Sequence, residues 1–342
     1  MGELKLKSKH RLLCGDSTDS ENVDRLVGDA SLVMLHADPP YGMGKEKDGI
    51  ANDNLYAEKL DGFQMQWWNA WRTKTADNGS AYIWGNAPDL WRLWYEGGLQ
   101  DSERLTMRNE VTWDKKHGQG MESEQHRMFP TASERCLFFM IGEQGFNNNA
   151  DNYWHGWDGI LHKLQKDCDA MGWTAKDIQR ICGVGLHGHW FTESQWQFIP
   201  EEHYKKLQAE ANKVGEHDEL KREHDAFKRE HDELKREFYA TRAFFNNTHD
   251  NMTDVWQFER VTGEERHGHA TPKPVEMVAR AIKSSSEEGD AVGVPFAGTC
   301  PELIACEQLD RKFYGMEIDP LYCDVIVKRW ENLTGRKAVR NG

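Results

Sequence analysis

The stretch Leu32-Val33-Met34-Leu35, followed by Asp38-Pro39-Pro40-Tyr41-Gly42, predicts how the chain folds around it. The apolar run is typical of a buried strand, and the two prolines fix φ near about −65° and remove two backbone donors. The strand therefore ends in a rigid turn that holds the Asp38 carboxylate and the Pro39 carbonyl in fixed directions. Two acceptors beside the Tyr41 ring suit an exocyclic amino group on a flat base, although a capped turn without a ligand is the alternative.

Strand and helix patterns alternate on both sides of this turn. In the first part we expect strands at 10–14, 32–37, 80–85, 106–113 and 134–141, and helices at 19–27, 56–76 and 87–98. After residue 251 we expect strands at 291–296 and 313–317, and helices at 274–285, 302–309 and 320–333. This alternation predicts an α/β fold with a mostly parallel, doubly wound sheet that is formed by residues 1–145 and 251–342.

Residues 146–250, between these two segments, have a different pattern. Two short helices, at 159–171 and 175–182, precede a third element that carries His189 and Trp190. Short helices separated by a glycine turn resemble a helix-turn-helix, and an ordinary helical subdomain is the alternative. The DNA-contacting interpretation assigns contacts to a pair of lysines, a single lysine on the second helix, and a His-Trp pair: Lys115, Lys116, Lys176, His189 and Trp190.

Residues 216–238 hold three seven-residue repeats. Leu220, Phe227 and Leu234 recur at every seventh position, and histidines fill the other position of the seam. The pattern predicts a weak coiled-coil helix at 216–238. Its partner would be another helix of this chain or the same helix of a second copy in a homodimer.

Composition narrows the class of protein. The 342 residues include 57 Asp and Glu against 43 Lys and Arg, so the net charge is −14. This argues mildly against a nucleic-acid partner, although a basic face can lie on an acidic protein. Seven irregularly spaced cysteines favour a reducing cytoplasm, and their spacing relative to histidines fits no common metal site. No apolar run reaches the roughly 18 residues of a membrane span, so we expect a cytoplasmic protein without a membrane partner.

A second candidate site lies in the last segment. A strand ends in the turn Phe296-Ala297-Gly298-Thr299-Cys300, and a helix and a second strand ending in Glu317 follow. This order is half of a nucleotide-binding βαβ unit, in which the acid accepts both ribose hydroxyls. The signal becomes specific in combination with the Asp38 turn.

Together the two sites resemble the S-adenosylmethionine-dependent amino-methyltransferases of DNA, in the permuted order that places the catalytic motif before the cofactor motif. The matching segments are Asp38-Pro39-Pro40-Tyr41, His269-Ala270-Thr271-Pro272-Lys273-Pro274, Phe296-Ala297-Gly298 and Met316-Glu317-Ile318-Asp319-Pro320-Leu321-Tyr322-Cys323. Three further segments are similar to a phage and prophage subgroup that methylates adenine N6 with relaxed sequence preference: Phe129-Pro130 with Glu134, His189-Trp190-Phe191 and Ser194-Gln195-Trp196.

The resemblance implies a Rossmann-like methyltransferase sheet with an inserted helical domain, S-adenosylmethionine as cofactor and double-stranded DNA as partner. It implies catalytic roles for Asp38, Pro39, Pro40 and Tyr41. The cofactor residues that it implies are Asp16, Thr271, Lys273, Phe296, Ala297, Gly298, Thr299, Glu317 and Asp319. Cytosine N4, an RNA base and a non-catalytic DNA-binding role are the alternatives.

Two residues depart from the family pattern. Val294 stands where Asp or Asn is usual, and Cys300 replaces the second glycine of F-x-G-x-G. A β-carbon at Cys300 is expected to narrow the path for the methionine part of the cofactor.

Overall fold

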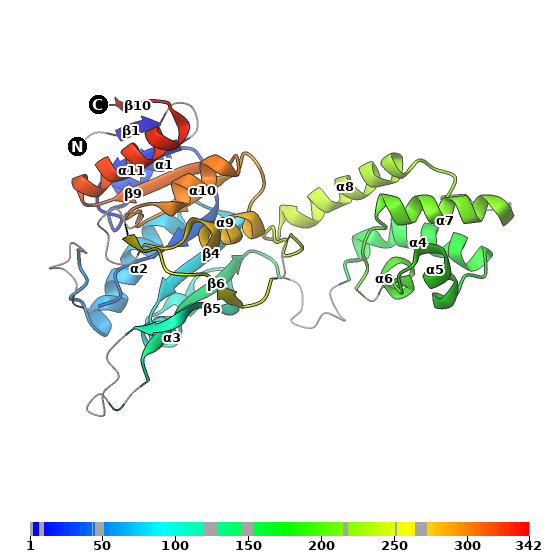
Figure 1. Cartoon of the computed structure of the whole chain (residues 1–342), viewed down its shortest axis with the longest axis horizontal. Coiled ribbons are helices and arrows are strands. Elements are labelled where there is room, and N and C mark those ends of the chain that lie inside the picture. Colours follow the sequence, from blue (N-terminus) through cyan, green and yellow to red (C-terminus); the bar gives the residue numbers. More distant parts are fainter. Residues whose placement is uncertain are drawn as a thin grey trace. The chain divides into compact units, whose positions relative to one another are not determined.

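The computed structural model describes residues 3–6, 10–42, 44, 51–119, 127, 129–144, 153–193, 195–214, 218–249, 252–263 and 272–341. The chain divides into a sheet unit, Met1–Glu143 with Arg242–Gly342, and a helical unit, Gln144–Thr241 (Figure 1). The helical unit ends at Thr241 and not at residue 250, because Phe245 packs in the core of the sheet unit and the Asn246 amide donates to the Ser284 carbonyl (2.8 Å).

The sheet unit is built on one ten-stranded sheet within the described residues. In spatial order its strands are β10 (Ala338–Asn341), β1 (Glu3–Leu6), β2 (His10–Cys14), β9 (Lys312–Glu317), β8 (Ala291–Val294), β3 (Leu32–Ala37), β4 (Thr75–Gly85), β6 (Thr131–Ile141), β5 (Leu105–Gln119) and β7 (Val255–Gln257). The five strands from β2 to β4 in this order run parallel to one another. On one side β1 is antiparallel to both β2 and β10, and on the other β6 is antiparallel to both β4 and β5. The predicted mostly parallel sheet is confirmed in these five central strands.

Helices cover both faces of the sheet, as its parallel strands require (Figure 1). One face is covered by α1 (Ser20–Val27), α2 (Glu58–Arg72) and α3 (Ala87–Tyr95), and the other by α9 (Val275–Ser285), α10 (Pro301–Gln308) and α11 (Pro320–Thr334). Trp67 anchors α2 in the first core, and Leu303 anchors α10 in the second, both with fully buried side chains. The fold is therefore doubly wound and Rossmann-like.

The order of the strands places the two sequence motifs side by side. β3 and β8 are neighbours, with Met34 opposite Val292. The chain continues from β3 to β4 on one side and from β8 to β9 on the other, so the winding reverses between them. Ligands of such sheets bind beyond the carboxyl ends of the strands at this switch point. The turns that follow β3 and β8 carry Asp38 and Phe296 to this edge.

The helical unit has its own core. Its helices are α4 (Asp158–Ala170), α5 (Ala175–Cys182), α6 (His187–Phe191), α7 (Glu201–Val214) and α8 (His224–Ala240). Trp190 is completely buried in that core, which corrects the prediction that it contacts DNA. Helix α6 contains five residues and uses Trp190 and Phe191 to pack inward, so its aromatic pair stabilises the unit.

The heptad segment is a helix over only part of its length. Helix α8 begins at His224, whereas the described residues 218–222 form a turn. The buried Asp167 carboxylate explains this correction, because it accepts hydrogen bonds from the backbone amides of Asp218 (3.1 Å), Glu219 (2.8 Å) and Leu220 (2.9 Å). A side chain that binds three successive amides stabilises the turn over the helix.

The seam of α8 packs within its own chain. Phe227 is completely buried in the core of the helical unit, and Leu234 packs against that core. The His231 ring stacks on Phe198 and on Trp157, with centroids 4.6 and 5.1 Å apart. These contacts satisfy the first of the two predicted arrangements, in which the heptad helix packs on another part of the same chain.

Candidate active site

Asp38 directly follows β3 and is surrounded by polar groups. Lys273 Nζ lies 2.5 Å from Asp38 Oδ1, and the Tyr41 hydroxyl donates to the same oxygen. Burial raises the pKa of Asp38, but the Lys273 ammonium, together with the Tyr41 hydroxyl and His36, more than offsets burial and holds this pKa below its ordinary value. The carboxylate is therefore ionised at neutral pH and serves as a hydrogen-bond acceptor.

A chain of alternating charges extends from Asp38 into the sheet. Lys273 Nζ also lies 3.4 Å from Glu134 Oε2, and Lys115 Nζ donates to Glu134 Oε1. The side chain of Lys273 is 2% exposed and that of Lys115 is 8% exposed. Buried charges are tolerated where each one has an opposite partner, and this chain of two acids and two lysines meets that condition.

Two predicted roles change with this cluster. Lys273 was expected to bind the cofactor, but its ammonium contacts Asp38 and donates to the Tyr41 hydroxyl (3.0 Å). Lys115 was expected to contact DNA, but its side chain points inward to Glu134, and burial lowers its pKa. Both lysines therefore belong to the charge chain of Asp38, because their side chains are buried and their ammonium groups are already bound.

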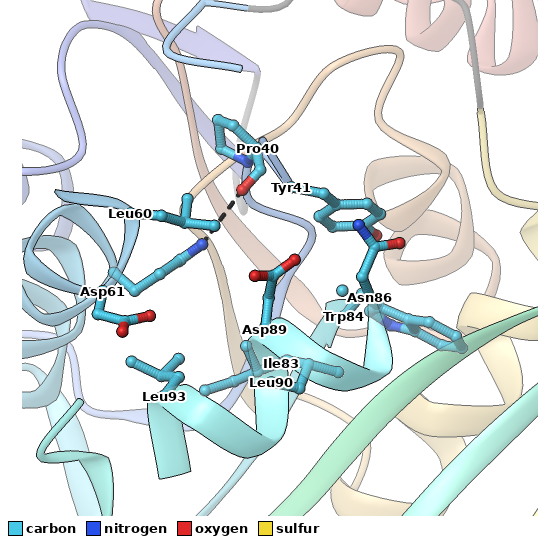
Figure 2. Close-up of a pocket in the computed structure, with 12 residues that line it drawn as sticks. Pro40, Tyr41, Leu60, Asp61, Ile83, Trp84, Asn86, Asp89, Leu90 and Leu93 are labelled. Carbon is cyan, nitrogen blue, oxygen red and sulfur yellow. Dashed lines mark hydrogen bonds between the residues drawn. The ribbon is translucent and has the colours of Figure 1, made fainter. Parts of the chain in front are cut away.

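The turn Asp38-Pro39-Pro40-Tyr41-Gly42 is held by hydrogen bonds between its backbone and the side chains of Asp53 and Gln64. The backbone amides of Tyr41 and Gly42 donate to Asp53 Oδ1 (2.9 and 3.0 Å), and Gln64 Nε2 donates to the Pro40 carbonyl (3.2 Å). Figure 2 shows the hollow behind the turn, which has an empty volume of about 280 Å³ and is lined by Pro40, Tyr41 and side chains of α2, β4 and α3. These bonds hold the backbone of the predicted catalytic motif in one conformation.

A second hollow lies at the carboxyl ends of β2, β8 and β9. Its empty volume, which includes space open to solvent, is about 330 Å³. Asp16, Phe296 and Glu317, three of the predicted cofactor residues, line it, and so does Pro40 of the Asp38 turn. Pro40 thus lies between the two hollows, and a ligand in the second hollow would contact the turn that carries Asp38.

The Glu317 carboxylate is oriented by the backbone. Gly298 N–H donates to Oε2 (2.7 Å) and Asp319 N–H donates to Oε1 (2.9 Å). Burial raises the pKa of Glu317, and the bonds from these two amides offset only part of the effect of burial. Each carboxylate oxygen keeps a further lone pair, so the group can still accept two hydroxyls of a ribose.

The remaining predicted cofactor residues support this arrangement from outside the hollow. Gly298 contributes its amide to Glu317, and Asp319 caps α11 by accepting from the Leu321 amide (2.8 Å). Ala297 and Thr299 are 3% exposed and pack in the loop. The prediction for Thr271 lies outside the described residues.

The two departures from the family pattern do not line the hollow. Val294 is completely buried, Cys300 is 1% exposed, and neither is among the described residues that line the hollow. The expectation that the Cys300 β-carbon narrows the path for the methionine part of the cofactor stays a prediction. Cys300 has a left-handed backbone (φ 55°), which costs a non-glycine residue about 1–2 kcal/mol.

Sequence reasoning missed three kinds of contact at this site. Ser17 and Phe63 line the second hollow, and the Ser17 hydroxyl donates to the Pro295 carbonyl. Ser17 had a local signal, because it follows Asp16 at the end of a predicted strand. Phe63 had none, because its place on α2 becomes significant only when α2 has packed on the sheet.

The third missed contact joins the cofactor side to β3. Trp84 Nε1 donates to His36 Nε2 (3.0 Å), so the ring proton lies on His36 Nδ1, which donates to Glu302 Oε1 (2.9 Å). All three side chains are at most 3% exposed. Glu302 stands at the start of α10, immediately after the loop of Cys300, so this loop is bonded to the strand that carries Asp38.

The other predicted DNA contacts remain at the surface. The Lys116 side chain is 45% exposed and lies 3.2 Å from Glu259 Oε1 in the sheet unit. Lys176 is exposed on α5 of the helical unit, and His189 Nδ1 lies 3.2 Å from the Gln195 carbonyl.

Among the described residues no helix is both long enough and apolar enough to span a membrane.

Comparison with known proteins identifies the family of the chain. A family model described as DNA methylase matches residues 32–328. The type II methyltransferase M1.MboII of Moraxella bovis is 23% identical over 328 residues, which cover 93% of this chain and 94% of the relative. The DNA adenine methyltransferase YhdJ of Escherichia coli (strain K12) is 37% identical over 78 residues, which cover 22% of this chain and 26% of the relative.

A solved structure shows the same fold. The crystal structure of the M1.HpyAVI–SAM complex superposes with a TM-score of 0.50 at 12% identity, and the match covers 93% of this chain and 98% of that one. The family match spans most of the chain, including the Asp38 turn and the segment that ends in Glu317. The chain belongs to the family of DNA methylases.

Proposed function

We propose that this DNA methylase transfers a methyl group from S-adenosylmethionine to the exocyclic N6 of adenine in double-stranded DNA. The observation that carries the proposal is that the ionised Asp38 carboxylate belongs to the same turn as Pro40. Pro40 lines the second hollow, which Glu317 also lines. The turn that carries Asp38, the acceptor for an amino group, thus borders the hollow that holds Glu317, the acceptor for a ribose. Methyl transfer requires the two substrates to meet in this way.

The residues of the second hollow fit S-adenosylmethionine. Glu317 presents an oriented carboxylate for the ribose hydroxyls, and the rings of Phe63 and Phe296 (centroids 6.0 Å apart) provide an apolar surface for the adenine. When bound, the cofactor supplies a methyl group on a positively charged sulfur, which is already a strong electrophile. The protein therefore needs to supply orientation and no strong base.

The residues of the turn would supply that orientation. A target adenine that has left the helix, at a cost of a few kcal/mol, would stack on the Tyr41 ring. Asp38 and the Pro39 carbonyl would accept its two N6 hydrogens, which draws the nitrogen toward sp³ geometry and directs its lone pair at the methyl group. The bond gained by the nitrogen would be matched by the bond lost at sulfur, and the nitrogen would then pass one proton to solvent by way of the Asp38 carboxylate.

Adenine is favoured over cytosine by the residues of the motif. Asp38 at the first position resembles the adenine-specific members of the family, and one relative carries the name of a DNA adenine methyltransferase. The permuted motif order and the three segments near 129, 189 and 194 support a phage or prophage type with relaxed sequence preference, which would protect DNA against restriction. Exposed Lys116 and Lys176, with His189, are the proposed DNA contacts.

The test is direct analysis of the product. Double-stranded DNA is incubated with the protein and S-adenosylmethionine, digested to nucleosides and analysed by mass spectrometry. We expect N6-methyladenine, and we expect Asp38→Asn to lower its rate at least about 100-fold, because an oriented charged acceptor is lost. The same variant should bind S-adenosylmethionine as the unmodified protein does, measured by calorimetry. N4-methylcytosine as the product, or an undiminished rate in Asp38→Asn, would contradict the proposal.

A further inference from the structure

The two oxygens of the Asp38 carboxylate have different surroundings. Lys273 Nζ (2.5 Å) and the Tyr41 hydroxyl both bind Oδ1. Among the described residues none donates to Oδ2. The Asp38 side chain is 25% exposed, whereas that of Lys273 is 2% exposed, so of this pair Asp38 is the side chain that is more open to solvent. One oxygen is thus occupied by the protein, and the other keeps its lone pairs for a ligand.

We propose that Lys273 is a positioning residue for methyl transfer, which binds Asp38 Oδ1 and thereby presents Oδ2 to the amino group of the target base. This inference rests on the proposed function and adds a residue that contacts neither substrate. A carboxylate with one oxygen held by an ammonium and a phenol has lost its rotation about the Cβ–Cγ bond. The position of the remaining oxygen is then fixed before the base arrives.

Lys273 is suited to this role because it is itself held in place. Glu134 Oε2 lies 3.4 Å from Nζ on the side of β6, and the Trp84 ring centroid lies 5.0 Å away. Trp84 in turn donates to His36 (3.0 Å), which fixes the plane of the indole. If the Asp38 carboxylate rotated, the Lys273 ammonium could follow it only by breaking its own contacts with Glu134 and Trp84.

The charge of Lys273 has a second effect on Asp38. Burial alone would favour the protonated acid, and a protonated Asp38 would offer a weaker acceptor to the amino group. The groups that face Asp38 from the elements packed against it are His36 on β3, Tyr41 in the turn, Lys273 before α9, Glu134 and Cys136 on β6, and Lys115 behind Glu134 on β5. Of these groups, Lys273 is the cation in direct contact with the carboxylate.

The experiment compares three variants of the full chain. Lys273→Met removes the ammonium, and Lys273→Arg keeps a positive charge with a different geometry. Lys337→Met is the control, because Lys337 is an exposed lysine of the sheet unit that pairs with Glu331. The measurement is the maximal methylation rate as a function of pH, with the KM for S-adenosylmethionine. Circular dichroism checks that each variant is folded.

For Lys273→Met we expect the acid limb of the rate profile to move up by about 1–3 pH units, the effect typical of an adjacent cation on Asp. Its maximal rate should fall at least tenfold with little change in KM. Lys273→Arg should keep the acid limb of the unmodified protein but lose rate, since the guanidinium cannot occupy the same position between Asp38 and Glu134. Lys337→Met should change neither the acid limb nor the maximal rate.

A second readout does not depend on activity. Protein labelled with ¹³C at the Asp carboxyl carbons is titrated by NMR, and the Asp38 resonance is identified by its loss in Asp38→Asn. The midpoint of this resonance should rise in Lys273→Met and stay low in Lys273→Arg. An unmoved midpoint in Lys273→Met, or full rate in Lys273→Arg, would overturn the inference. If the unmodified protein methylates no DNA, the proposed function fails, while the titration still decides whether Lys273 controls Asp38. If Lys273→Met does not fold, the rate of Lys273→Arg decides the positioning role.

Discussion

The acids of the two sites are held in different ways. Asp38 is bound by Lys273, which lies far away in sequence and is itself paired with Glu134 on another strand. Glu317 is bound by the backbone amides of Gly298 and Asp319, which belong to its own segment. The pKa of Asp38 is lowered, whereas the pKa of Glu317 is raised. A full opposite charge thus compensates burial, and the two amides do so only in part.

The largest effect is expected where the paired charges are broken. Glu134→Ala removes the carboxylate that pairs with Lys115 and that lies 3.4 Å from Lys273 Nζ. Loss of one partner of a buried ion pair typically costs about 3–5 kcal/mol. We expect a loss of this size in the free energy of unfolding, measured by urea titration. Glu259→Ala is the matched control, because Glu259 pairs with the exposed Lys116 and such pairs contribute about 0–1 kcal/mol. Equal losses for the two variants would show that the charge chain does not stabilise the fold.

An intermediate effect is expected at Glu317, in the binding of S-adenosylmethionine. Since the pKa of Glu317 is raised, the carboxyl takes up its proton at a higher pH than an ordinary Glu and then accepts ribose hydroxyls less well. Calorimetry should show affinity falling as the pH falls through this raised pKa. Glu317→Gln should bind about tenfold more weakly at neutral pH, the loss of about 1.4 kcal/mol, and should not show the pH dependence. An Asp38→Asn variant that lost the same pH dependence would instead place it at the catalytic turn.

The same raised pKa has a defined consequence for stability. A group whose pKa is higher in the folded than in the unfolded state adds stability below its unfolded pKa. This contribution is lost as the pH rises through the folded pKa. Glu317 therefore lowers the free energy of unfolding at neutral pH, where Asp38, with its lowered pKa, raises it.

The smallest effect is expected at Cys300. Replacement by glycine removes the strain of a left-handed residue, about 1–2 kcal/mol, but also removes a buried thiol and frees the unfolded chain. These contributions oppose each other, so Cys300→Gly should change the free energy of unfolding by less than about 1 kcal/mol. Because Cys300 does not line the hollow, the affinity for S-adenosylmethionine should stay within twofold. A tenfold gain in affinity in Cys300→Gly would contradict this and would show that the Cys300 side chain obstructs the cofactor.

The same difference explains which parts of the site the sequence predicts. The strand before Asp38 and the segment from Phe296 to Glu317 are continuous, so their apolar runs, turns and acids are visible in order. The doubly wound sheet follows from the alternation of such segments. The partner of Asp38 was not visible in this way. Lys273 reaches the carboxylate only because the switch point brings the end of β3 close to the residues before α9.

For one residue the sequence held a signal that was not used. Trp113 and Lys115 alternate along a strand and therefore face the same side, and both are less than 9% exposed. Lys116 faces the other side and is exposed. The alternation of side chains along β5 thus predicts that Lys115 points inward and Lys116 points outward. A prediction based only on the clustering of basic residues assigns both lysines to DNA.

The heptad segment shows what no local pattern can specify. The sequence Glu-His-Asp-Glu-Leu-Lys-Arg occurs twice, at 216–222 and at 230–236. The second copy lies within α8, while the described part of the first, 218–222, is a turn held by Asp167. The two copies are identical, so exchanging them would leave the molecule unchanged. Residues outside the copies, such as Asp167, therefore determine which copy forms a turn and which forms a helix. A repeat unit that is duplicated into a new neighbourhood can therefore take on a new conformation without a single substitution of its own.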